Sequence, residues 1–172
     1  FKDPLAVVVQ PGAAAEGLLH IVNVVISPEA AVFPRVFIRA GQGAVLDRAN
    51  VNTGSFVFEL DNADAVTLSN LSITGAFDGI NVRNGSILFT LQNSRVYENA
   101  NSGLNITDTA STNPTIQDNV FYGDVGAGAS RDQNYGVYSV GQNPTVLRNQ
   151  AYHINGRSNF GIQLVNAGTR VV

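Results

Sequence analysis

Apolar and polar residues alternate in short runs along most of the chain, and these runs recur. Five segments begin with a glycine followed by alternating apolar residues, and they are Gly54–Phe58, Gly79–Val82, Gly103–Ile106, Gly136–Val140 and Gly161–Leu164. Their glycines are spaced 25, 24, 33 and 25 residues apart. Alternation with period two predicts β-strands. The best helical candidate, residues 13–16, is short, so an all-β fold is expected.

A second recurring segment lies between the first ones and ends in asparagine. Its copies are Val66–Asn70, Phe89–Asn93, Pro114–Asn119 and Pro144–Asn149, with a weaker earlier copy at Pro34–Ile38. A unit of about 24 residues cannot bury its own apolar face and must stack on its neighbours. Stacking predicts two buried columns spaced about 4.8 Å per coil. They are Leu68, Leu91, Ile116 and Val146, and Ile80, Leu104, Val137 and Ile162.

The asparagines of these segments also fall into columns. Asn70 and Asn93 share one offset from their threonines, and Asn119 and Asn149 share the next offset. Asparagine tolerates a left-handed backbone at a sharp bend and forms local hydrogen bonds through its amide. Stacked amides can also bond to each other along a column. An asparagine ladder is therefore expected at the bends.

These glycine-led and asparagine-ended strands resemble the right-handed parallel β-helix of the pectin-lyase-like superfamily. Gly41–Asp47 is similar to a segment that often precedes the repeats in such proteins. The resemblance implies an all-β, single-stranded right-handed solenoid of about six coils. We expect one domain over residues 1–172, in which 1–33 form an irregular first coil or N-terminal cap and 34–172 form clear repeats. Thr169–Val172 reads as the start of a strand, so the solenoid is expected to continue or to stack on a partner.

Composition narrows the classes of function. The net charge of −3 provides no basic excess for a nucleic acid, and no run of 18 apolar residues is present to insert into a membrane. Cysteine is absent, which excludes disulfides and thiolate metal sites. The superfamily includes lyases, hydrolases, epimerases, phage tailspikes and non-enzymatic surface proteins, so the fold alone does not give the function. The resemblance favours an extracellular or cell-surface location.

An aromatic column provides the candidate site. Tyr97, Tyr122 and Tyr152 each lie seven residues after a repeat threonine. If the coils align, Glu98, Asp124 and His153 project from one face beside them, with Arg131 and Arg157 nearby. Tyrosines stack on sugar rings, and the charged residues could bind or deprotonate a uronate, which makes Glu98, Asp124 and His153 the candidate catalytic residues. The alternative is that the tyrosines stack on each other and the charges are solvated.

The longest unit lies between Thr115 and Thr145, and its extra residues fall within Tyr122–Asn134. In a solenoid, extra residues emerge as a loop on one face, often the binding face. The plainer interpretation is a surface loop without a function, because such loops lengthen at little cost.

Known catalytic signatures of the superfamily are missing. We find no Asn-Thr-Asp, paired Asp-Asp, His-Gly or Arg-x-Lys of polygalacturonases, and Asp3-Pro4 lacks the histidine of the alginate epimerases. Pectate lyases bind calcium through clustered aspartates, and the one dense acidic cluster here is Glu59, Asp61 and Asp64. Calcium needs six or more converging oxygens, so a plain acidic surface is the alternative. Calcium is thus the one cofactor that the sequence suggests.

Three functions follow from these observations. We expect an extracellular structural or adhesive β-helix that contacts a polysaccharide or cell-surface glycan without catalysis. The first alternative is a polysaccharide lyase or epimerase that acts on uronate-containing glycans. The second is a filament subunit that stacks end to end, because a solenoid without caps has open strand edges at both ends.

Overall fold

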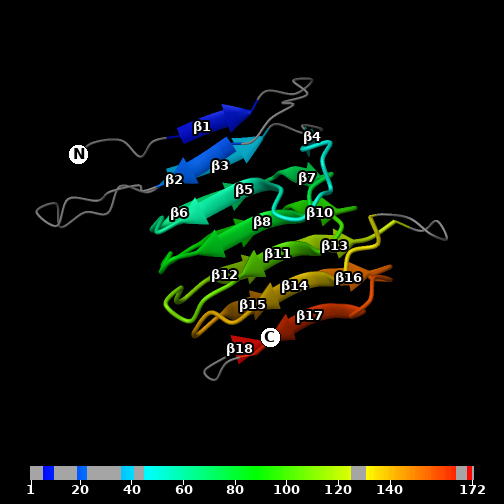
Figure 1. The fold of residues 1–172 in the computed structure, drawn as a ribbon. Helices are drawn as coiled ribbons and strands as arrows, with labels where there is room; N and C mark the ends of the chain where they lie inside the picture. Colours follow the sequence, from blue (N-terminus) through cyan, green and yellow to red (C-terminus); the bar gives the residue numbers. More distant parts are fainter. Residues whose placement is uncertain are drawn as a thin grey trace, which may run out of the picture.

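The structure is a computed structural model that describes residues 6–9, 19–22, 36–40, 45–124, 131–165 and 170–171. Its strands form three parallel sheets whose members stack as successive rungs from β1 to β18 (Figure 1). The seven-stranded sheet contains β1 (Ala6–Val9), β3 (Val36–Ala40), β6 (Val66–Ser69), β9 (Thr90–Gln92), β12 (Thr115–Gln117), β15 (Thr145–Leu147) and β18 (Arg170–Val171). The five-stranded sheet contains β4 (Val45–Asp47), β7 (Ser72–Thr74), β10 (Arg95–Tyr97), β13 (Val120–Tyr122) and β16 (Gln150–Tyr152). The six-stranded sheet contains β2 (Leu19–Val22), β5 (Phe56–Asp61), β8 (Asp78–Arg83), β11 (Ser102–Ile106), β14 (Tyr135–Ser139) and β17 (Phe160–Leu164).

The chain visits the seven-, five- and six-stranded sheets in that order, once per coil. This arrangement confirms the predicted parallel β-solenoid. Among the described residues, five coils have a strand in every sheet, from β3–β5 to β15–β17, which is slightly fewer than the six expected. The same residues contain no helix long and apolar enough to cross a membrane. The helical candidate at 13–16 and most of the expected cap at 1–33 lie outside the described residues.

Both predicted apolar columns are confirmed. Leu68, Leu91, Ile116 and Val146 are aligned in adjacent strands, and Ile38 of the weaker Pro34–Ile38 copy extends the column. All five are at most 3% exposed. The second column, from Ile80 to Ile162, is aligned in the six-stranded sheet and is buried except at Ile162, which packs against the core. Identical columns stack because each coil repeats the strand period of the one below it.

The repeat glycines are explained by close approach of the coils. A Cβ added to Gly79 would lie 2.7 Å from the carbonyl oxygen of Gly103, and one added to Gly103 would lie 2.6 Å from that of Gly136. The first predicted copy was wrong in register, because Val57 rather than Gly54 lies opposite Gly79. Gly54 is instead a turn residue with φ +85, and its Cβ position is open.

Asparagines hold the bend between the seven- and five-stranded sheets. Asn70 and Asn93 have left-handed φ values of 57 and 51. In the next, inward-facing position, the Ser94 backbone N donates to Asn119 Oδ1 at 2.9 Å, and Asn119 Nδ2 donates to Asn149 Oδ1 at 3.0 Å. The predicted ladder is therefore present, and it satisfies backbone groups that the bend would otherwise bury without partners.

Candidate functional site

The tyrosine column has the predicted alignment. Tyr97, Tyr122 and Tyr152 are opposite one another in β10, β13 and β16. Their ring centroids are 4.8 and 5.2 Å apart, and the rings are nearly parallel. Burial is the main cause of a raised pKa for Tyr97 and for Tyr122. Glu98 adds to it for Tyr97, the neighbouring tyrosines add to it for Tyr122, and Arg95 opposes it in both. The phenols of these two residues are therefore neutral hydrogen-bonding groups near neutral pH.

This stacking limits what the tyrosines can bind. A sugar stacks on the face of an aromatic ring, and the facing sides of these rings already cover each other. The rings of Tyr152 and His153 also meet in a T-shaped pair with centroids 5.3 Å apart. The column therefore presents ring edges and hydroxyls along most of its length, so self-stacking accounts for this spacing without a sugar ligand.

The candidate catalytic residues are not aligned as a set. Tyr97, Tyr122 and Tyr152 are opposite one another, so Glu98 and His153 align with Gly123, and Asp124 belongs to the next position along the coil. Glu98 and His153 have left-handed φ values of 51, which makes both of them bend residues. The backbone N of Asp124 donates to the Arg131 carbonyl at 3.1 Å and closes the base of the long loop. Residues 125–130 of that loop lie outside the described residues.

The calcium candidates are engaged with other groups. Arg83 Nε lies 2.8 Å from Glu59 Oε1, and its Nη2 lies 3.0 Å from Asp61 Oδ2. Asp64 accepts the Ile87 backbone N at 3.1 Å. Over the described residues, no group of three or more His, Cys, Asp or Glu side chains is arranged to hold a metal ion. The guanidinium of Arg83 thus occupies the position beside the Glu59 and Asp61 carboxylates where a metal cation would bind.

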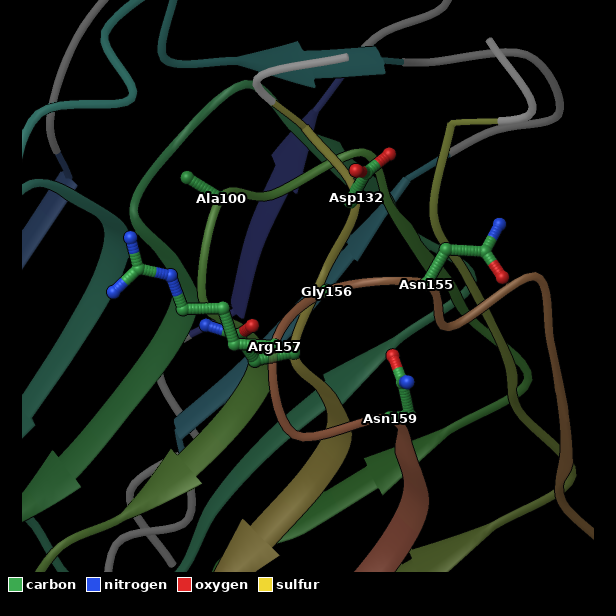
Figure 2. Close-up of a pocket in the computed structure, with 7 residues that line it drawn as sticks. Ala100, Asp132, Asn155, Gly156, Arg157 and Asn159 are labelled. Carbon is green, nitrogen blue, oxygen red and sulfur yellow. The ribbon is translucent and has the colours of Figure 1, made fainter. Parts of the chain in front are cut away.

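A pocket of about 400 Å³ lies where three successive coils pass from the five- to the six-stranded sheet. We call it the 132–159 pocket, and its lining residues are Ala100, Asp132, Asn134, Asn155, Gly156, Arg157 and Asn159. The loop from Asn155 to Asn159 curves along it, and the charged ends of Asp132 and Arg157 extend in different directions (Figure 2). The pocket thus combines an acid, a cation and three amides. Of the residues predicted from sequence, it contains Arg157 but not Arg131.

Aromatic residues directly follow two of the pocket-lining asparagines in the sequence. Tyr135 follows Asn134, and Phe160 follows Asn159, at aligned positions of β14 and β17. Their rings stack with centroids 6.1 Å apart, and Tyr138 tilts against Tyr135 at 5.1 Å. Phe160 is 47% exposed. We call Tyr135, Tyr138 and Phe160 the aromatic patch. Polar groups beside an accessible aromatic face form the combination that protein sites use for amphipathic ligands such as sugars.

Sequence reasoning placed Asp132 and Asn134 in the long segment Tyr122–Asn134 without singling them out, and it did not identify Asn155, Asn159 or the aromatic patch. One available signal was the residue before each repeat glycine, which is Asp78, Ser102, Tyr135 and Phe160 in successive coils. The aromatic residues Tyr135 and Phe160 lie in the two coils that supply every pocket residue except Ala100. The loop residues have no such column, because the connections between β10 and β11, β13 and β14, and β16 and β17 differ in length.

Comparison with known proteins agrees with the geometry. A family model described as a right-handed β-helix region matches residues 31–172, which is most of the chain. No curated protein and no solved structure matches the chain.

Proposed function

The chain belongs to the right-handed β-helix family, and from that premise we propose that it is an extracellular structural module that contacts a glycan through the 132–159 pocket. The observation that carries this proposal is the polar pocket together with the aromatic patch, whose Tyr135 and Phe160 directly follow the pocket residues Asn134 and Asn159. Asp132 and the asparagine amides offer acceptors and donors for hydroxyl groups, and Phe160 offers an aromatic side chain that is 47% exposed. Arg157 adds a cation suited to a carboxylate or other anionic substituent.

The rigid solenoid favours a binding role. Three successive coils hold the pocket residues, and the backbone N of Asn155 donates to the Asp132 carbonyl at 3.1 Å. The backbone N of Gly156 likewise donates to the Gln133 carbonyl at 3.2 Å. Preorganised groups lose little conformational freedom when a ligand binds, so a shallow site can still discriminate between ligands.

Binding to immobilised polysaccharides tests the proposal. The panel contains neutral and uronate-containing polymers, and retention of the purified chain is measured for each. We expect retention by at least one polymer and a loss of about tenfold or more in affinity for Arg157→Ala, because removing one partner of a charged hydrogen bond costs roughly 1.5–3 kcal/mol. Arg95→Ala is the matched control, since Arg95 is exposed on β10 outside the pocket.

Two results would overturn the proposal. One is an absence of retention by every polymer, and the other is an equal loss for Arg157→Ala and Arg95→Ala. Tyr135→Ala and Tyr152→Ala compare the aromatic patch with the tyrosine column, and the first is expected to have the larger effect. An unsaturated uronide product that disappears in Asp132→Asn would replace the non-catalytic role with a lyase.

Self-association is a second candidate function, supported by the exposed apolar residues of the last complete coil. Tyr152, Phe160 and Val165 are 45, 47 and 52% exposed, and β16 and β17 are the outermost described strands of their sheets. Electron micrographs over a range of concentrations test it. Rods that lengthen with concentration would support end-to-end stacking, whereas single short particles at every concentration would count against it.

A further inference from the structure

A column of amides connects the pocket to a buried carboxylate two coils away. Asn134 Nδ2 donates to Asn101 Oδ1 at 3.0 Å, and Asn101 Nδ2 donates to Asp78 Oδ1 at 2.9 Å. Asp78 is 9% exposed, whereas Asn134 lines the pocket. The three residues therefore form a continuous path of hydrogen bonds along the edge of the six-stranded sheet.

The carboxylate of Asp78 determines how each amide in this path is oriented. The two ends of an amide have almost the same shape, so its neighbours decide which end is oxygen and which is nitrogen. An ionised carboxylate only accepts, so Asn101 must turn its NH₂ group toward Asp78. Its oxygen then faces Asn134, which must donate in turn. The oxygen of Asn134 consequently points away from Asn101 and toward Gly156. A Cβ added to Gly156 would lie 2.3 Å from this oxygen.

We propose that Asp78 is a positioning residue that fixes the amide of Asn134 with its oxygen toward the 132–159 pocket. In this arrangement Asn134 accepts a hydrogen bond from the ligand and favours a hydroxyl over an acceptor such as an ether or carboxylate oxygen. The ligand preference rests on the proposed function, whereas the orientation of the amide does not.

The surroundings of Asp78 show how it can be replaced. Asp78 Oδ2 accepts Asn105 Nδ2 at 3.1 Å, and Asn105 Oδ1 is buried without a partner. In Asp78→Asn, a turned Asn105 amide can offer this oxygen to the new NH₂ group, so the variant is expected to fold. The amide at position 78 can then present either end to Asn101, and the column loses its fixed direction. Asp78→Ser is a second variant, because Ser102 occupies the aligned position one coil later.

A double-mutant cycle tests the orientation without any ligand. Asn134→Asp places acceptor oxygens against Asn101 Oδ1, and Asn101 cannot turn while Asp78 requires its NH₂ group. We expect Asn134→Asp to raise the unfolding equilibrium constant about tenfold more in the Asp78 chain than in Asp78→Asn or Asp78→Ser, as measured by urea unfolding. Asp61→Asn controls for charge, since it removes a carboxylate of the same sheet outside the amide column.

The outcomes separate the two proposals. Equal effects of Asn134→Asp in all backgrounds, or the same relief in Asp61→Asn, would refute the positioning role. If no polysaccharide binds, the proposed function fails and the cycle still decides the orientation. If Arg157→Ala weakens binding, Asp78→Asn should weaken binding to the same polymer about threefold or more, and unchanged affinity would refute the effect of Asp78 on ligand preference.

Discussion

Replacement of Asn119 by alanine tests how far the inner ladder stabilises the solenoid. Asn119 is 1% exposed and makes three hydrogen bonds through its amide. Its Oδ1 accepts the Ser94 backbone N at 2.9 Å, and its Nδ2 donates to the Leu91 carbonyl at 3.0 Å and to Asn149 Oδ1 at 3.0 Å. Asn119→Ala therefore leaves the Ser94 N–H and the Leu91 carbonyl short of a partner inside the core.

The expected cost follows from those two groups. A buried N–H without a partner costs about 1–3 kcal/mol, and the loss of one hydrogen bond to the Leu91 carbonyl of β9 costs about 0.5–1.5 kcal/mol, so Asn119→Ala should lower the free energy of unfolding by about 1.5–4.5 kcal/mol. For a chain of 172 residues, each kcal/mol corresponds to roughly 2–4 °C in Tm. Asn119→Ser should recover part of the loss, because Ser94 in the same column already accepts the Leu71 backbone N at 3.2 Å.

Thermal and urea unfolding followed by circular dichroism measure these differences. Asn93→Ala is the matched control, since Asn93 is exposed and loses mainly the left-handed preference of asparagine, worth about 1 kcal/mol. Equal destabilisation by Asn119→Ala and Asn93→Ala would mean that the inner ladder adds nothing beyond the bend conformation. A serine variant no more stable than the alanine variant would refute the role given to the Ser94 N–H.

Three further outcomes are expected. Gly103→Ala should destabilise by about 1–3 kcal/mol through overlap with the Gly136 carbonyl, and Gly54→Ala by about 1 kcal/mol through its positive φ alone, as compared by urea midpoints. Burial raises the pKa of Asp78 above its usual 3.8, so the folded state holds its proton more tightly than the unfolded state. The wild type should therefore lose stability relative to Asp78→Asn as pH rises from about 3.8 through the folded pKa. Millimolar calcium should leave Tm unchanged, because Arg83 already pairs with Glu59 and Asp61 of the acidic cluster, and an increase in Tm would refute this.

The alignment of equivalent residues in successive coils is the part of this structure that could be predicted from the sequence. The alignment of Leu68, Leu91 and Ile116 and the ladder at Asn119 could be read from the sequence, because each coil places the same residue type at the same backbone position. The predicted register was wrong where the chain departs from this rule. At Gly54 a turn glycine resembled the repeat glycine, although only the latter is required by contact between coils.

The same logic explains why the pocket was missed. Asp132 and Asn155 lie on connections of different length, so no fixed offset from a repeat residue identifies them. Their proximity depends on the stacking of coils that are more than twenty residues apart in the sequence. Arg157 was identified through its residue type rather than through its position.

The two aromatic groups show what sequence spacing leaves undecided. A regular column of tyrosines predicts that the rings lie one coil apart, which Tyr97 and Tyr122 confirm at 4.8 Å. That distance is also the stacking distance of two rings, so strict regularity uses up the ring faces. Tyr135 and Phe160 occupy a column that holds Phe56, Asp78 and Ser102 in the earlier coils, and Phe160 at its end is 47% exposed. Regular spacing of aromatic residues in a β-solenoid therefore indicates stacked rings and does not by itself identify a binding surface.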